Sequence, residues 1–287
     1  MNQTTNLQDQ ESIRQKVREG YGRIAISPGA SCCGPSSCCS ADSGDAASQL
    51  AQTIGYSTDD LAGLPEGANM GLSCGNPVAL ASLQPGETVV DLGSGGGFDI
   101  FIAGRKVGAS GCAIGVDMTP EMLSKARKNI AAYTQQTGLS NVEFRLGEIE
   151  HLPLADNSVD VLISNCVINL SPDKPQVWRE IYRVLKPGGR AAVSDIALLQ
   201  PLPPIISEMV EALVGCVAGA VLADETRRMM AQANLTDIRM EKRESYIDSM
   251  KEIQDPLYKK IKEALPPGAK LGDYAASMAI SARKPMS

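Results

Sequence analysis

The sequence has little of what several common protein functions require. It contains one histidine, His151, so Cys/His zinc sites and histidine-based acid–base catalysis are both poorly supplied. It has no dense run of Lys and Arg, and its formal net charge of −6 disfavours nucleic acid as a partner. No apolar run reaches the roughly 18 residues that a membrane-spanning helix needs. Residues 1–10 are polar and lack the apolar stretch of a signal peptide, so we expect a soluble, cytoplasmic protein with no membrane partner.

What the sequence does contain is a glycine-rich turn directly after an apolar strand, in the segment 89–98 (VVDLGSGGGF). In an open α/β sheet, ligands bind just beyond the carboxyl ends of the strands, where such a turn would lie. A dinucleotide and S-adenosylmethionine (SAM) are the candidate ligands, and a structural turn without function is the alternative. The dinucleotide motif G-x-G-x-x-G fails at its last position, which is Phe98. Asp91 would repel a pyrophosphate but suits the ammonium group of SAM.

Two further acidic residues at predicted strand ends favour SAM. Asp117 ends the apolar segment 113–117, about 20 residues after the first glycines, where a carboxylate holds a ribose diol. Its alternative role is that of a turn residue that begins a helix. Glu148 follows a third strand and could reach an adenine amino group. Three acids at three strand ends together predict a SAM site.

The order of the predicted elements indicates the fold class. Strands and helices alternate, which is typical of an α/β protein with a doubly wound, mostly parallel sheet, the Rossmann-like fold of class I SAM-dependent methyltransferases. The clearest helix is 119–137, with Thr119 as its N-cap, Pro120 in its first turn and Gly138 just past its end.

We predict the other elements from apolar periodicity and turn residues. Trp178 is expected to be a packing residue, and the tail of the chain is expected to hold a helix and closing strands. The remaining predicted elements are a helix at 11–20, a strand at 159–165, a helix at 176–185, a turn at 186–189, a strand at 190–196 and a lid helix at 208–223. These give three regions: an N-terminal helix and cysteine-rich loop (1–63), a SAM-binding core (64–200) and a C-terminal region with a lid helix that carries Cys216 (201–287).

The cysteines are numerous for a protein of a reducing compartment, where such a set is more often metal-binding or catalytic than a disulfide scaffold. Cys74 lies in a loop of small residues, which favours exposure. Cys166 directly follows the predicted strand 159–165, so it is a methyl acceptor, a nucleophile, a ligand for the acceptor, or a buried structural thiol. Cys112, at a strand start, is expected to be structural. The eight are Cys32, Cys33, Cys38, Cys39, Cys74, Cys112, Cys166 and Cys216.

One set of segments is more specific than the glycine turn: 69–77 (NMGLSCGNP), 91–97 (DLGSGGG), 115–122 (GVDMTPEM), 164–170 (SNCVINL) and 215–219 (GCVAG). Together they resemble the arsenite methyltransferase family. The resemblance implies that trivalent arsenic, as arsenite and then as methylarsenite, is held by Cys74, Cys166 and Cys216 and is methylated by SAM for detoxification. Arsenic(III) is soft and prefers thiolates. Its lone pair carries no proton, so a single histidine is no obstacle.

The resemblance also implies which residues bind the cofactor. Asp91 and the glycine turn would hold the methionine end of SAM, and Asp117 the ribose. The full set is Asp91, Gly93, Ser94, Gly95, Asp117, Met118, Glu148, Ile149 and Asn165.

Members of the family further use an upstream cysteine that forms a disulfide with the residue matching Cys74 and consumes a thiol reductant, of the glutathione or thioredoxin type. The stretch 31–40 offers four candidates, of which we favour Cys32 or Cys33. Those two cysteine pairs could instead clasp a soft metal ion or have no essential role. Two other functions remain open: a SAM-dependent methyltransferase of a small organic acceptor, and a soft-metal-binding protein that has kept the fold.

Overall fold

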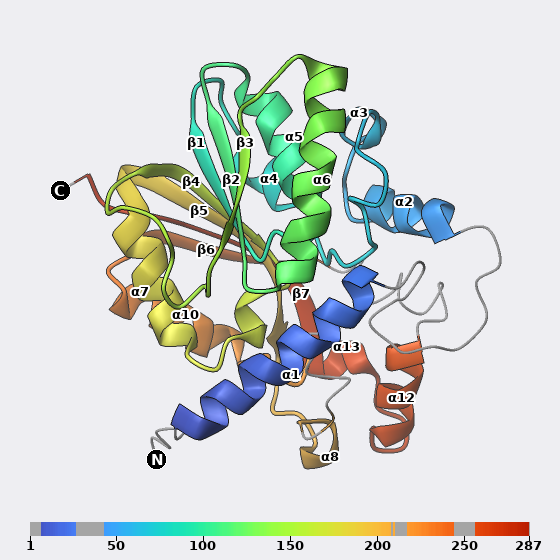
Figure 1. Cartoon of the computed structure of the whole chain (residues 1–287). Coiled ribbons are helices and arrows are strands. Elements are labelled where there is room, and N and C mark those ends of the chain that lie inside the picture. The colour runs from blue at the N-terminus through green and yellow to red at the C-terminus, as the bar shows by residue number, and fades with distance from the viewer. Residues whose placement is uncertain (1–6, 27–42, 208, 210–216, 244–255, 287) are drawn as a thin grey trace.

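The computed structural model describes residues 7–26, 43–207, 209, 217–243 and 256–286, and these residues form a seven-stranded sheet with helices on both faces (Figure 1). Its strand order is β3-β2-β1-β4-β5-β7-β6. The first five strands are parallel, and β7 runs antiparallel to both of its neighbours. The strands are β1 (Thr88–Leu92), β2 (Cys112–Asp117), β3 (Val142–Leu146), β4 (Val159–Asn165), β5 (Leu185–Leu198), β6 (Thr236–Arg243) and β7 (Ala275–Arg283).

The helices of the described residues precede, connect and follow these strands. None of them is long and apolar enough to cross a membrane. They are α1 (Leu7–Ile26), α2 (Ser43–Thr53), α3 (Thr58–Leu61), α4 (Pro77–Ala81), α5 (Phe98–Val107), α6 (Pro120–Thr137), a 3₁₀ turn (Ile168–Leu170), α7 (Lys174–Val184), α8 (Pro204–Ser207), α10 (Ala223–Gln232), α12 (Pro256–Ala264) and α13 (Leu271–Tyr274).

The sheet is buried on both faces by helices. Successive side chains of a strand point to opposite sides, so each strand contributes to two apolar clusters. In β1, Val89 belongs to the apolar cluster that α4, α5 and α6 cover. Val90 and Leu92 belong to the cluster on the other face, under α7 and α10. Trp178 of α7 is fully enclosed in that second cluster, so its predicted packing role is confirmed. The core therefore has three layers, with the sheet in the middle.

A third apolar cluster lies at the carboxyl ends of the central strands. It brings together Val17 of α1, Ile206 of α8, Ile261 of α12 and further side chains around Cys74 and Cys166. Segments from both ends of the chain thus meet at the same edge of the sheet. This is the edge at which α/β proteins bind their ligands.

The clearest local predictions are confirmed. Strand β4 has the predicted bounds, Val159–Asn165. Helix α6 runs from Pro120 to Thr137, and Gly138 ends it in the left-handed conformation, with φ of 72°. Thr119 occupies the N-cap position, although its side chain makes no capping hydrogen bond.

Two local predictions are wrong. The stretch 186–189 is not a turn between α7 and β5 but part of β5 itself. The strand is irregular there, since Gly188 has a positive φ of 77° and the register with β4 shifts. The stretch is bonded to the end of the chain: Gly188 N donates to Lys284 O at 3.0 Å, and Lys284 N donates to Gly189 O at 2.9 Å. The predicted lid helix fails over 217–222, where Leu222 forms a bridge with Leu198 of β5, and α10 begins only after it. The rest of that prediction, 208 and 210–216, lies outside the described residues.

Candidate functional site

A pocket of about 990 Å³, partly open to solvent, lies at the carboxyl ends of β1, β2 and β4. Helix α1 also contributes a wall, through Arg14, Val17 and Tyr21, which sequence patterns did not reveal. Of the residues predicted to bind the cofactor, all except Glu148 line this pocket: Asp91, Gly93, Ser94, Gly95, Asp117, Met118, Ile149 and Asn165.

The glycine turn after β1 has a conformation that requires glycine. Gly93, Gly95 and Gly97 all have positive φ, at 67°, 50° and 91°. A Cβ on Gly93 would lie 2.4 Å from a methyl carbon of Val167, which follows β4. The turn is fixed to the end of β2, because Gly93 N donates to Val116 O at 2.7 Å. The backbone therefore approaches the pocket without side chains in the way.

Asp91 is a buried carboxyl group that lacks a partner for one oxygen. It is 3% exposed, and its Oδ1 makes no hydrogen bond. Burial raises the pKa of Asp91 well above its ordinary value, and the nearby Asp99 and Asp117 carboxylates raise it further. No cation of the described part of the chain forms an ion pair with any of these three acids. Such a site gains most from a ligand that brings a positive charge.

Asp117 holds the glycine turn in place and also lines the pocket. Its Oδ2 accepts from Gly95 N at 2.9 Å and its Oδ1 from Thr119 N at 2.8 Å. Burial raises its pKa, although these two hydrogen bonds act in the opposite direction. The Thr119 side chain donates a third hydrogen bond to this carboxylate. Its two oxygens have four lone pairs in all, so one remains for a hydroxyl group of a ligand. Both roles predicted for Asp117, in the turn and in the pocket, are therefore compatible.

The third predicted acid, Glu148, is turned away from the pocket lining. Its carboxylate lies 3.5 Å from Arg14 Nε and 3.5 Å from Arg18 Nη2, both on α1. Glu150 lines the pocket instead, buried to 3% exposure, and accepts a hydrogen bond from Ser171 Oγ at 2.6 Å. Side-chain alternation could not have chosen Glu150 over Glu148, because residues two positions apart point to the same side of an extended chain. The role of Glu148 at the adenine stays a prediction.

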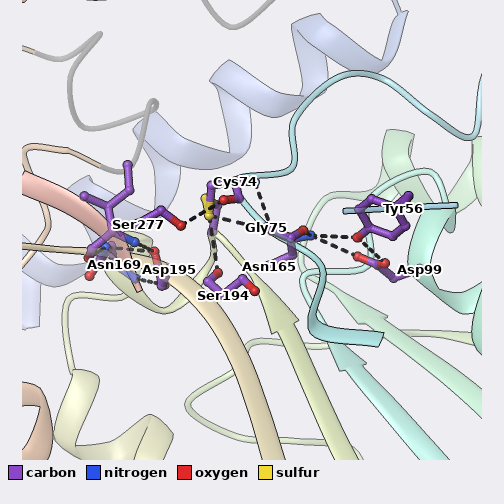
Figure 2. Close-up of a disulfide and its surroundings, with 11 residues drawn as sticks. Tyr56, Cys74, Gly75, Asp99, Asn165, Asn169, Ser194, Asp195 and Ser277 are labelled. Atoms are coloured by element: carbon purple, nitrogen blue, oxygen red, sulfur yellow. Dashed lines mark hydrogen bonds between the residues drawn. A yellow bond between two sulfur atoms is a disulfide. The ribbon is translucent and has the colours of Figure 1, made fainter. Parts of the chain in front are cut away.

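Cys74 and Cys166, which are 92 residues apart in sequence, form a disulfide at the edge of the pocket (Figure 2). The expectation that Cys74 is exposed is wrong, since its exposure is 1%, and Cys166 is 6% exposed. The loop of Cys74 packs against β5 and β7. Cys74 O accepts from Ser277 Oγ at 2.9 Å, and its sulfur lies 3.4 Å from Ser194 O.

Asn165 connects this loop to the pocket. Its Oδ1 accepts from Cys74 N at 3.1 Å, and its Nδ2 donates to Gly75 O at 2.9 Å and to Asp99 Oδ2 at 3.2 Å. Tyr56 OH donates to the other Asp99 oxygen at 2.6 Å (Figure 2). Burial raises the pKa of Asp99 to about 6, against these hydrogen bonds, which lower it.

The remaining cysteines fall into two groups. Cys112 lies at the start of β2 and packs against the core, with a pKa raised by burial. The described residues contain no group of three or more His, Cys, Asp or Glu side chains that could hold a metal ion. The predicted third thiolate and the predicted redox cysteines lie outside the described residues: Cys216, Cys32, Cys33, Cys38 and Cys39.

Comparisons with known proteins agree with this geometry. Residues 83–234 match the model of a family described as "Methyltransferase domain". An arsenite methyltransferase of Halobacterium salinarum is 45% identical over 285 residues, which are 96% of this chain and 68% of that protein. The chain belongs to the arsenite methyltransferase family. A second relative of that name, from Aquipseudomonas alcaligenes, is 42% identical over 61% of this chain and 51% of its own length.

A solved structure supports the same assignment within the family. The arsenic (III) S-adenosylmethionine methyltransferase of Chlamydomonas reinhardtii is 32% identical, with a TM-score of 0.59 over 84% of this chain and 73% of that one. The fold predicted from the sequence, a Rossmann-like class I SAM-dependent methyltransferase, is therefore confirmed.

The pocket of this arsenite methyltransferase family member fits SAM in two respects that can be checked residue by residue. Asp91 Oδ1 has no hydrogen-bond partner, and the ammonium group of SAM could donate to it. Ser94 Oγ is a second buried polar atom without a partner on the same turn, available to the carboxylate of SAM. The donor set thus matches the charged methionine end of the methyl donor.

Proposed function

We propose that this protein transfers methyl groups from SAM to trivalent arsenic, first arsenite and then methylarsenite, held by Cys74, Cys166 and Cys216. One observation carries the proposal: two of the three predicted arsenic ligands, from distant parts of the sequence, meet at the edge of the pocket that fits SAM. Thiolates are the ligands that a soft centre such as arsenic(III) prefers.

The chain's own residues supply positioning rather than proton transfer. Bound SAM provides a methyl group on a positively charged sulfur, which the arsenic lone pair can accept directly. No proton leaves the acceptor, so no general base is needed. His151, the single histidine, is exposed and does not line the pocket. Cys166 does line it, and a thiolate there would hold arsenic in near-attack geometry.

The disulfide gives the proposal a redox requirement. While Cys74 and Cys166 share an S–S bond, neither can bind arsenic as a thiolate. A thiol reductant of the glutathione or thioredoxin class would break that bond, delivering two electrons and two protons and itself becoming a disulfide. Donation of its lone pair to the methyl group leaves arsenic formally pentavalent, so a return to the trivalent state takes two electrons. Cys74 with Cys32 or Cys33 is proposed to supply them by forming a disulfide, which the thiol reductant then reduces. The proposed role is detoxification in the cytoplasm, a compartment that would supply such reductants.

The test is single-turnover conversion of arsenite with SAM and a thiol reductant, with methylated arsenic followed by chromatography. The variants are Cys74→Ser, Cys166→Ser and Cys216→Ser, and Cys112→Ser is the matched control because it lies outside the pocket. We expect methylarsenicals from the parent protein and from the control. Each of the three ligand variants should lose about 100-fold or more in rate, because the acceptor is no longer aligned.

SAM affinity is measured in parallel, since it should change little in the cysteine variants. Arsenite binding without methylation by the parent protein would favour a sequestering function instead. Full activity of Cys166→Ser, or no arsenite binding while SAM still binds, would point to an organic acceptor.

A further inference from the structure

We propose that Tyr56 is a positioning residue that couples the binding of the methyl donor to the binding of arsenic. It would act through a hydrogen-bond network of three residues, Tyr56, Asp99 and Asn165. The inference rests on the proposed function, because the segment that the network holds is the one that carries Cys74.

Tyr56 itself does not line the pocket, so its role cannot be direct contact with the cofactor. Its side chain is 3% exposed, and its ring packs against Phe98 with 4.8 Å between the ring centroids. Its hydroxyl donates to Asp99 Oδ1 at 2.6 Å and accepts from Asn165 Nδ2 at 3.2 Å. The Ser73 side chain, next to Cys74, also hydrogen-bonds to this hydroxyl. Replacing the hydroxyl with hydrogen would leave the ring packing in place and remove only these bonds.

Asn165 is the connection between the cofactor side and the cysteine side. Its NH₂ group has two hydrogens for three acceptors, so Asp99 and Tyr56, each at 3.2 Å, share one of them on one side. On the other side the NH₂ group donates to Gly75 O and the amide oxygen accepts from Cys74 N (Figure 2). Gly75 packs closely against Ser194 because it has no Cβ, which would lie 2.7 Å from Ser194 Oγ. A rotation of this one side chain would therefore break two hydrogen bonds that hold the Cys74 segment, while the bond from Ser277 remains.

Asp99 is the link to the cofactor because it lines the pocket beside Asp91. The groups that act on it are the donors Tyr56 and Asn165 and the carboxylates of Asp91 and Asp60. A cation bound at Asp91 would favour negative charge on Asp99. A charged acceptor strengthens the hydrogen bonds that it receives, and here these bonds orient the Asn165 amide.

Coupling of this kind is reciprocal. If the methyl donor orders Asn165 and thereby the Cys74 segment, then arsenic bound at Cys74 must improve the affinity for the donor by the same factor. Tyr56 contributes to that factor without touching either ligand.

The experiment measures the Kd of S-adenosylhomocysteine, which has the same ammonium end but no transferable methyl group, with and without arsenite. Calorimetry is done on the full chain reduced with a phosphine, which supplies no competing thiol. Tyr56→Phe is compared with Tyr133→Phe, a matched control in which the lost buried hydroxyl bonds to Asn141 Oδ1 at 2.9 Å, outside the pocket. Asp99→Asn is a second variant that removes the charge and keeps the shape.

For the parent protein and Tyr133→Phe we expect arsenite to tighten S-adenosylhomocysteine binding about tenfold, a factor within the usual range of coupling. For Tyr56→Phe and Asp99→Asn the factor should fall below about two. Parent-like coupling in Tyr56→Phe, or no coupling in the parent protein, would overturn the inference. Methylation of arsenite by the parent protein, assayed separately, distinguishes this failure from failure of the proposed function.

Discussion

At the scale of single residues, the pocket brings together buried carboxyl groups with which no cation of the described residues forms an ion pair. Asp91, Asp99 and Asp117 are each less than a tenth exposed, and burial raises the pKa of all three. Leaving a buried polar atom without a partner has a cost, and Asp91 Oδ1 bears it until a ligand arrives. A ligand that donates a hydrogen bond to Asp91 Oδ1 would remove this cost, and that contributes to its binding free energy.

The first prediction concerns that residue. Asp91→Asn should weaken S-adenosylhomocysteine binding by about 10- to 100-fold, since a hydrogen bond to a charged group contributes about 1.5–3 kcal/mol. Asp156→Asn is the control, because its carboxylate is 68% exposed and pairs with Arg183 away from the pocket. Calorimetric titration of both variants checks it, and equal affinities for both would show that Asp91 does not receive the ammonium group.

Residue identities at the site were only partly predictable from sequence. Asp91 and Asp117 could be predicted because each lies within one residue of the end of its strand, and strand ends converge on one edge of a parallel sheet. Glu148 and Glu150 are both near such an end, and α1, which is distant in sequence, contacts both: Arg14 lies 3.5 Å from Glu148 and 3.7 Å from Glu150. The burial of Cys74 depends on β5 and β7, which lie more than a hundred residues further along the chain.

At the scale of elements, the glycine turn after β1 is where conformation and packing both constrain the sequence. Gly93 has left-handed backbone geometry and, in addition, no room for a Cβ beside Val167. Gly138, at the end of α6, has a similar φ of 72° but nothing within 4 Å of its Cβ position. A side chain at Gly138 would cause backbone strain alone, whereas one at Gly93 would cause backbone strain and a steric clash.

The second prediction uses this pair. Gly138→Ala should lower the free energy of unfolding by about 1 kcal/mol, the usual cost of left-handed geometry in a residue with a Cβ. Gly93→Ala should cost about 2–4 kcal/mol, because overpacking adds to the strain. It should also abolish measurable binding of S-adenosylhomocysteine, whereas Gly138→Ala binds normally. Urea unfolding and titration of both variants check this, and matching stabilities would mean that Val167 moves aside.

Local signals sufficed for elements whose ends are fixed by their own residues, such as α6 with Pro120 and Gly138. They failed where a distant segment decides. The stretch 186–189 has the composition of a turn, but hydrogen bonds between its glycines and the backbone of Lys284 keep it in β5. Leu222 likewise forms a bridge with β5, so residues 217–222 are not helical as predicted.

At the scale of the whole molecule, buried carboxyl groups link stability to pH. Asp195 is 4% exposed and accepts hydrogen bonds from Asn169 and from Ile196 N, yet burial raises its pKa to about 7. Asp99 has a pKa raised to about 6. Both values exceed the ordinary 3.8, so the folded state binds protons more tightly than the unfolded state does.

The third prediction follows from the sign of that difference. The stability that protonated Asp195 contributes is fully present below the unfolded pKa, near 4, and is lost as the pH rises through about 7. The Tm of the parent protein without ligand should therefore fall relative to that of Asp195→Asn between about pH 5 and pH 8. Scanning calorimetry across this range checks it, with Asp156→Asn as the control. A constant Tm difference would mean that Asp195 remains charged throughout.

The hydrogen bond from Ser277 Oγ to Cys74 O joins residues that are 203 positions apart. A ribosome adds about 5–20 residues per second, so roughly 10 to 40 seconds pass between the synthesis of Cys74 and that of Ser277. Throughout that interval Cys74 and later Cys166 emerge without β7, the strand that helps to bury the Cys74 loop. The newly made chain therefore presents reactive sulfur to the cell before it has the structure that protects it. Arsenite present during synthesis could therefore bind these thiols before the chain has folded.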